Sequence, residues 1–110
     1  MQKESLTALV RHHLEAARSS SSGRSAQTLY GGHEHVLRQT LVALRAGSTL
    51  DEHESPGEAT LQVLHGRITL VAGKDRWNGS PGDLFFVPDR RHAVEAVEDS
   101  VVLLTVGKRP

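Results

Sequence analysis

The spacing of hydrophobic residues divides the chain into two parts near residue 24. In the first part, the positions that repeat at helical spacing are Leu6, Leu9, Val10, His13, Leu14 and Ala17. Ser5 lies just before them and can accept a hydrogen bond from the first helical turn. The pattern therefore predicts one amphipathic helix over residues 5–18, followed by a flexible serine-rich joint at residues 19–23.

An isolated helix of this length is only marginally stable in water, so its apolar stripe needs a surface to pack on. The favoured interpretation is that the helix docks on its own domain or on a second subunit. A membrane-surface or regulatory helix is the alternative, and the polar face is not strongly basic, which argues against the membrane.

After the joint, short runs rich in Val, Leu, Ile and Thr alternate with turns that contain Gly and Pro. These runs predict strands over residues 26–30, 36–44, 59–64, 67–72, 84–87, 92–97 and 101–106. A parallel sheet would need crossover helices, for which the connecting segments are too short. We therefore expect an all-β antiparallel domain over residues 25–110, with residues 1–24 as a helical arm and joint.

Composition narrows the functions that such a domain can have. The chain has 110 residues, enough for one hydrophobic core. Thirteen Lys+Arg balance thirteen Asp+Glu and aromatic residues make up only 4%, so we expect no nucleic-acid partner. The absence of cysteine excludes disulfides, thiolate zinc sites and cysteine nucleophiles. Without a long apolar run or a signal-peptide pattern at the start, we expect a cytoplasmic protein with no membrane partner.

Two segments of the β region resemble the two sequence motifs of the cupin family. The first, GSTLDEHESPGEATLQVLHG, runs from Gly47 through His53 to Gly66, and the second, GDLFFVPDRRH, runs from Gly82 to His92. The chain is thus similar to small single-domain cupins of the RmlC-like type over residues 27–106. The resemblance implies a double-stranded β-helix, or jelly-roll barrel, behind the N-terminal helix. It also implies a homodimer joined through sheet edges.

Metal-binding cupins hold their ion with two histidines and one acid from the first motif and one histidine from the second. His53 and His92 match two of these positions, whereas Ser55 and Ala59 occupy the other two. Glu58 lies one residue before the expected acid and would reach the ion only if a bulge turned it inward. One interpretation is therefore a site of His53, His92 and Glu58 that holds a divalent ion such as Zn, Fe, Mn or Ni.

The other interpretation is a metal-free pocket for a small molecule inside the barrel. Strand alternation places Ala59, Leu61 and Val63 on one face, so Leu61 and Val63 would form an apolar wall. His53 and His92 would then orient the ligand as polar groups in a largely apolar cavity.

The strand at 36–44 offers a further polar group for such a pocket. Arg38, Gln39 and Thr40 interrupt its aliphatic run, and one of them should face inward. Gln39 shares its parity with Leu41 and Ala43, so we expect Gln39 to be the inward-facing ligand-binding residue. Burial of this strand in a dimer interface is the alternative.

Three functions follow from these interpretations. The first is a cupin-domain protein that binds a small molecule inside the barrel. The second is a divalent-metal-dependent enzyme of the dioxygenase or isomerase type. The third is a regulatory or structural module that acts through the N-terminal helix. The motifs do not choose between binding and catalysis, because one fold hosts many chemistries.

Overall fold

The computed structural model describes residues 1–53 and 57–108. In this part of the chain it contains one helix and nine strands: α1 (Leu6–Ser19), β1 (Arg24–Tyr30), β2 (Leu37–Leu44), β3 (Thr49–His53), β4 (Gly57–His65), β5 (Ile68–Ala72), β6 (Asp75–Gly79), β7 (Leu84–Phe86), β8 (His92–Ala96) and β9 (Ser100–Lys108). The helix begins where the sequence predicts, because the Ser5 side chain accepts a hydrogen bond from the Ala8 amide at 3.2 Å.

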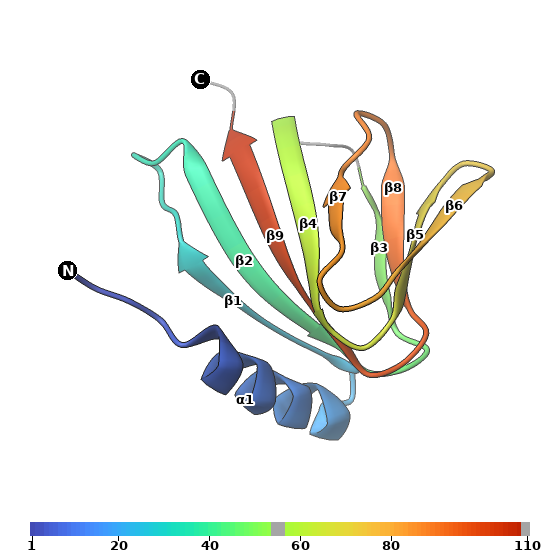
Figure 1. The fold of residues 1–110 in the computed structure, drawn as a ribbon, viewed down its shortest axis with the longest axis horizontal. Coiled ribbons are helices and arrows are strands. Elements are labelled where there is room, and N and C mark those ends of the chain that lie inside the picture. The colour runs from blue at the N-terminus through green and yellow to red at the C-terminus, as the bar shows by residue number, and fades with distance from the viewer. Residues whose placement is uncertain (54–56, 109–110) are drawn as a thin grey trace.

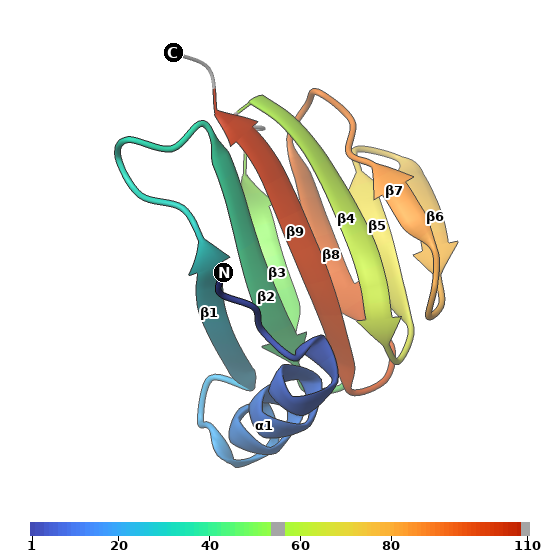
Figure 2. The same ribbon diagram turned by 60° about the vertical axis from the view of Figure 1, so that its left-hand side comes forward.

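The strands form two antiparallel sheets that face each other (Figures 1 and 2). One sheet has five strands in the order β1-β2-β9-β4-β7, and the other has four in the order β3-β8-β5-β6. The chain crosses repeatedly between the sheets, and β9 lies at the centre of the larger one. The predicted all-β jelly roll is confirmed, although the described strands leave the two sheets separate rather than closed into one barrel.

A hydrophobic core fills the space between the inner faces of the sheets. It consists of Val42, Leu44, Leu61, Val63, Ile68, Leu70, Val94, Ala96 and Val102. The contributions of β2, β4, β5 and β8 are each two residues apart along the strand, as expected when alternate side chains leave opposite faces of a sheet. The predicted inward face of β4 is confirmed, since Leu61 and Val63 are both in this core.

A second core lies on the outer face of the five-stranded sheet, under α1. Leu14 and Ala17 of the helix pack against Leu41, Ala43 and Val101 of β2 and β9. Figure 2 shows the helix lying against this sheet near the start of β1. The helix therefore docks on its own domain, which was one of the two surfaces favoured from the sequence.

The end of the helix is tied to the turns beneath it. Arg18 forms an ion pair of 2.7 Å with Asp99, and Asp99 also accepts a hydrogen bond of 2.8 Å from the Ala46 amide. Arg45 donates to the carbonyl oxygens of Arg18 and Ser20. These contacts hold the joint after the helix against the β2–β3 turn.

The turn between β4 and β5 needs a glycine. Gly66 has a φ of +80°, and a Cβ atom at this position would lie 2.2 Å from the Asp99 carbonyl oxygen. Any side chain here would therefore push apart the two turns that meet at this end of the molecule.

In the described part of the chain, no helix is both long enough and apolar enough to cross a membrane.

Candidate functional site

The two histidines of the motif prediction come together on neighbouring strands. β3 pairs with β8, and the Cα partner of His53 is His92. The His92 side chain is 4% exposed and alternates with Val94 and Ala96, which face the inner core. The side chain of His53 lies outside the described part of the structure. The fold therefore brings the two backbone positions together and buries the imidazole of His92.

The orientation of the His92 ring is fixed by its own loop. Its Nδ1 atom lies 2.8 Å from the carbonyl oxygen of Arg90. A carbonyl oxygen can only accept a hydrogen bond, so Nδ1 carries the proton. In the neutral ring, Nε2 is then the basic nitrogen.

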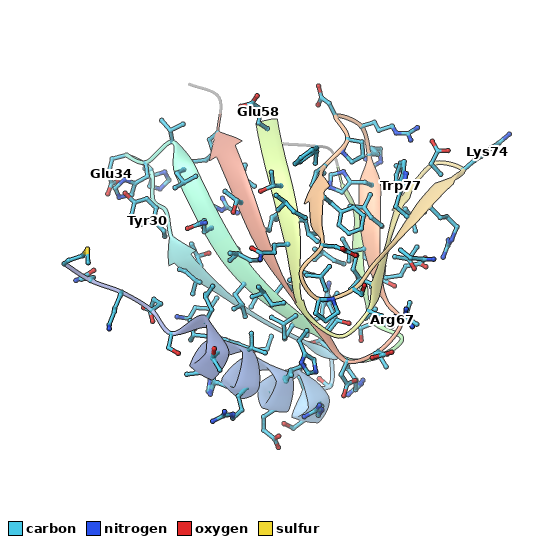
Figure 3. The ribbon with its side chains drawn as sticks, in the orientation of Figure 1. Tyr30, Glu34, Glu58, Arg67, Lys74 and Trp77 are labelled. Atoms are coloured by element: carbon cyan, nitrogen blue, oxygen red, sulfur yellow. The ribbon has the colours of Figure 1, made fainter. Side chains whose placement is uncertain are left out.

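Glu58 does not have the bulge that it would need to face the predicted site. β4 pairs with β9 in unbroken register from Gly57 to Val63, with Glu58 opposite Gly107. No bulge in this segment rotates Glu58, which is exposed and alternates with inward-facing Ala59. Figure 3 shows Glu58 at the upper end of β4. The strand alternation that places Leu61 in the core therefore directs Glu58 away from it.

The described residues do not fit a divalent metal ion. No group of three His, Asp or Glu side chains in the described part of the chain is placed to hold one. Of the three predicted ligands, His92 alone has a described side chain that points toward the interior. A divalent ion commonly takes four or more ligands, which one imidazole does not supply. The described side chains therefore do not form a complete site for a divalent ion.

The predicted inward orientation of Gln39 is also wrong. Gln39 does share its face of β2 with Leu41 and Ala43, but that face lies under α1 and not between the sheets. The Gln39 amide nitrogen donates a 3.2 Å hydrogen bond to the hydroxyl of Thr105 on β9. The sequence correctly predicted that Gln39 shares a face of β2 with Leu41 and Ala43. It did not predict that this face lies outside the space between the two sheets.

The residues on the opposite parity line an open cavity on the inner face of the five-stranded sheet. Its volume is about 400 Å³, and its lining residues are Arg24, Ala26, Arg38, Thr40, Val42, Leu50 and Leu104. Ala26 pairs with Val42, and Thr40 pairs with Leu104, so these side chains leave the same face of the sheet. Ala26 is exposed although Val42 is only 6% exposed. The opposite sheet therefore covers Val42 of β2 but leaves Ala26 of β1 open.

The cavity walls are mostly apolar, with two cationic side chains among them. Arg24 and Arg38 are both exposed, and neither forms an ion pair within the described residues. The predicted ligand contacts Leu61 and Val63 are 2% and 0% exposed, packed in the core and absent from this lining. The cavity is thus displaced from the predicted position toward β1 and β2.

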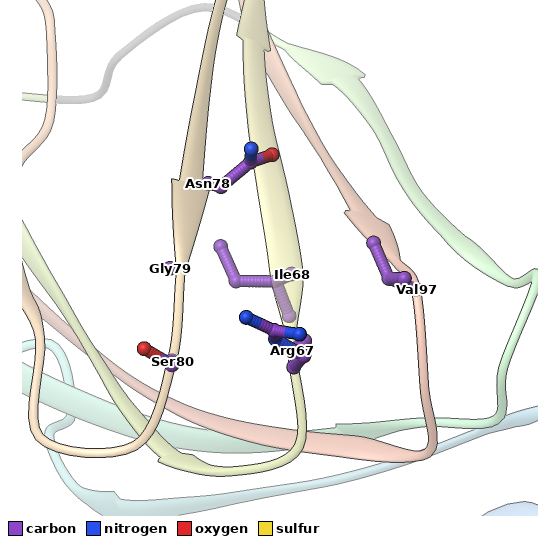
Figure 4. Close-up of a pocket in the computed structure, with 6 residues that line it drawn as sticks. All are labelled: Arg67, Ile68, Asn78, Gly79, Ser80 and Val97. Atoms are coloured by element: carbon purple, nitrogen blue, oxygen red, sulfur yellow. The ribbon is translucent and has the colours of Figure 1, made fainter.

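A smaller depression lies at the β5–β6 end of the other sheet (Figure 4). It has a volume of about 250 Å³ and is lined by Arg67, Ile68, Asn78, Gly79, Ser80 and Val97. Two of its polar groups are already bonded to the protein. Asn78 accepts from the Thr69 hydroxyl at 3.0 Å, and Ser80 bonds to the Asp83 carboxylate. Its volume is below the usual range for a small-molecule site.

Sequence reasoning missed the arginines of the cavity on the five-stranded sheet. The available signal was the parity of β2, on which Arg38, Thr40 and Val42 alternate with the residues that face the helix. Deciding which set of alternate β2 residues faces the other sheet required knowing which face of β2 the helix covers.

Solved structures with the same architecture support the fold. An RmlC-like cupin protein from Desulfovibrio desulfuricans is 24% identical with a TM-score of 0.76, over 97% of this chain and 96% of that chain. A protein of unknown function from Streptococcus pyogenes is 25% identical with a TM-score of 0.72, over 83% of this chain and 79% of that chain. A DMSP lyase from Ruegeria pomeroyi is 22% identical with a TM-score of 0.67, over 76% of this chain and 46% of that chain.

No protein-family model and no curated protein matches the chain. The structural similarity shows that the chain has the cupin fold, as a small jelly-roll domain, which the two sequence motifs predicted. These similarities assign neither a substrate nor a reaction.

Proposed function

For this chain with the cupin fold, we propose that it binds a small molecule in the open cavity on the inner face of the five-stranded sheet. This proposal rests on the cavity itself. Its volume of about 400 Å³ and its mostly apolar walls with a few polar groups match the usual properties of small-molecule sites. The walls come from β1, β2, β3 and β9, which are anchored by the two hydrophobic cores.

The floor of the cavity is built on rigid elements. Val42 belongs to the inner core, and Leu50 and Leu104 pack against that core while still lining the cavity. A ligand with an apolar body would cover these side chains and the exposed Ala26 at the rim. Burial of apolar surface would then provide much of the binding free energy, about 25 cal/mol for each Å² removed from water.

A neutral fluorophore tests this proposal. N-phenyl-1-naphthylamine should bind the protein with a rise in fluorescence, and Ala26→Phe should weaken binding at least about fivefold, because the larger ring fills the rim. The matched control is Ala46→Phe, since Ala46 is exposed in the β2–β3 turn, away from the cavity. Unchanged affinity in Ala26→Phe, or equal loss in both variants, would overturn the proposal.

A catalytic function is the second candidate, and one observation favours it. His92 is buried, and its bond to the Arg90 carbonyl leaves Nε2 as the basic nitrogen. Elemental analysis separates a metal-dependent enzyme from a metal-free binding domain. Stoichiometric metal in the purified protein that disappears in His53→Ala would favour the enzyme and contradict metal-free binding. Metal-free samples in both cases would favour the binding domain.

A further inference from the structure

We infer that residues 87–91 form a lid over the imidazole of His92, and that the side chain of Arg90 holds this lid closed. The lid joins β7 of the five-stranded sheet to β8 of the four-stranded sheet. Figure 1 shows it at the upper end of the molecule, where the chain passes from one sheet to the other. The inference concerns access to His92 and does not depend on a ligand in the cavity beside β1.

The backbone of the lid is bonded to the buried ring. His92 is 4% exposed, and its Nδ1 atom donates a 2.8 Å hydrogen bond to the carbonyl oxygen of Arg90. The Arg90 amide donates to the Pro88 carbonyl oxygen at 2.9 Å, which bends the lid into a three-residue turn. A movement of Arg90 away from β8 therefore breaks a hydrogen bond of the buried imidazole and uncovers that side of the ring.

The side chain of Arg90 contacts β6 through two different groups. Its guanidinium forms an ion pair with Asp75, and its Cζ atom lies over the Trp77 ring, 5.8 Å from the ring centre. Asp75 and Trp77 leave the same face of β6, because their partners on β5 are Ala72 and Leu70, which are both buried. One guanidinium thus meets a carboxylate and an aromatic ring together.

These contacts hold the lid across the end of a neighbouring strand. In the four-stranded sheet, β5 lies between β8 and β6, and β6 is an edge strand. Arg90 lies two residues before the start of β8, whereas its partners Asp75 and Trp77 are on β6. The side chain therefore connects the lid to a strand with which β8 does not pair.

The strength of these contacts suits a lid that opens. The side chains of Arg90 and Asp75 are 48% and 57% exposed, and ion pairs and cation–π contacts between exposed groups are individually weak. A cavity of about 570 Å³ also lies between the lid and β4, with Val87 and Asp89 of the lid among its lining residues. The Val87 amide donates to the Ala59 carbonyl oxygen at 3.0 Å. The lid is therefore anchored at one end, with space beside it.

The test measures how fast diethyl pyrocarbonate modifies His92 in the full chain at one fixed pH, with mass spectrometry to locate the product. The exposed His65 in the same sample is the internal reference. In the wild type, His92 should react more slowly than His65. Arg90→Gln should raise the His92 rate at least about threefold, because the lid loses both its ion pair and its cation–π contact.

Two further variants assign the effect to this contact. Asp75→Asn removes the same ion pair from the other side and should also raise the His92 rate. Combined with Arg90→Gln, it should add little, because both substitutions remove one shared interaction. Arg76→Gln is the matched control, since Arg76 lies on the opposite face of β6 and forms a 2.7 Å ion pair with Glu95. This variant should leave the His92 rate unchanged.

Hydrogen exchange separates opening of the lid from loss of the fold. In Arg90→Gln, the amides of residues 87–92 should exchange faster, while those of β9 keep their wild-type rate. The inference is overturned if His92 reacts as fast as His65 in the wild type, or if its rate is unchanged in Arg90→Gln. An equal rise in Arg76→Gln, or faster exchange in both the lid and β9, would also overturn it, because the whole domain would then have been destabilised.

Discussion

The two faces of the β1–β2 pair have opposite environments, although consecutive residues of the same two strands alternate between these faces. On the outer face, α1 covers Leu41 and Ala43, which are both 0% exposed. On the inner face, the four-stranded sheet stops short of β1, and Ala26 lies at the rim of the cavity. The covered face serves stability, and the open face lines the cavity of the proposed function.

The helix is therefore part of the domain and not an appendage. It seals one side of a sheet whose other side faces the second sheet only in part. The same kind of substitution should therefore lower stability much more on the face that α1 covers than on the open face.

The largest effect is expected from Leu14→Asp on the helix. Leu14 is 6% exposed among Leu41, Ala43 and Val101, so the change buries a carboxylate without a partner. The free energy of unfolding should fall by more than about 3 kcal/mol. Thermal unfolding measures the loss, at about 4–8 °C for each kcal/mol in a domain near this size.

The same substitution on the open face is the control. Ala26→Asp should change stability by no more than about 0.5 kcal/mol, since Ala26 is exposed. Equal losses in the two variants would show that the faces do not differ in the way described.

A smaller loss is expected from His13→Ala, which removes a polar link between the helix and β1. His13 is 5% exposed, and its two ring nitrogens lie 2.7 Å from the Ser25 hydroxyl and 2.8 Å from the Gln27 side-chain oxygen. Losing these bonds should lower the free energy of unfolding by about 1–3 kcal/mol, measured by chemical denaturation. His12→Ala is the matched control, because His12 is exposed on the same helix. A similar loss in His12→Ala would remove the special role of His13.

The smallest effect is a pH-dependent one at the end of the helix. The Ala46 amide, and after it the Arg18 side chain, lower the pKa of Asp99 from its ordinary value of 3.8. A carboxyl with a lowered pKa in the folded state stabilises the protein above its ordinary pKa, and this contribution is lost as the pH falls through the lowered value. Asp99→Asn should therefore reduce Tm at neutral pH, and the difference from the wild type should close below about pH 3.8.

Glu98→Gln provides the comparison for that measurement. Glu98 is the exposed neighbour of Asp99, and its side chain forms no bond within the described residues. Its Tm should follow the wild type across the same pH range. A gap between wild type and Asp99→Asn that stays constant down to low pH would contradict the ionic role of Asp99.

Much of the fold was predictable because it depends on local alternation. The seven predicted strands all exist, and Ser5 caps the helix. β3 and β6 were missed. β6 contains Asp75, Asn78 and Gly79, which have low strand propensity, and its pairing with β5 overrides that local preference.

The candidate site was less predictable because it depends on how elements meet. Alternation placed Gln39 and Leu41 on one face, but only the docking of α1 makes that face the outer one. Likewise, the inward turn of Glu58 required a bulge that the pairing of β4 with β9 does not contain. The small-molecule ligand and the homodimer stay predictions, since both depend on a second molecule.

The central position of β9 has a consequence for the order of folding. α1 is made before all the strands during synthesis, yet it packs on Val101, and β9 is the strand that joins β2 to β4. Until Ser100–Lys108 has left the ribosome, β1–β2 and β4–β7 have no strand between them and the helix lacks part of its seat. Such distant pairings make folding slow compared with that of helical bundles. The domain must therefore assemble late, when nearly all of its residues are free at once.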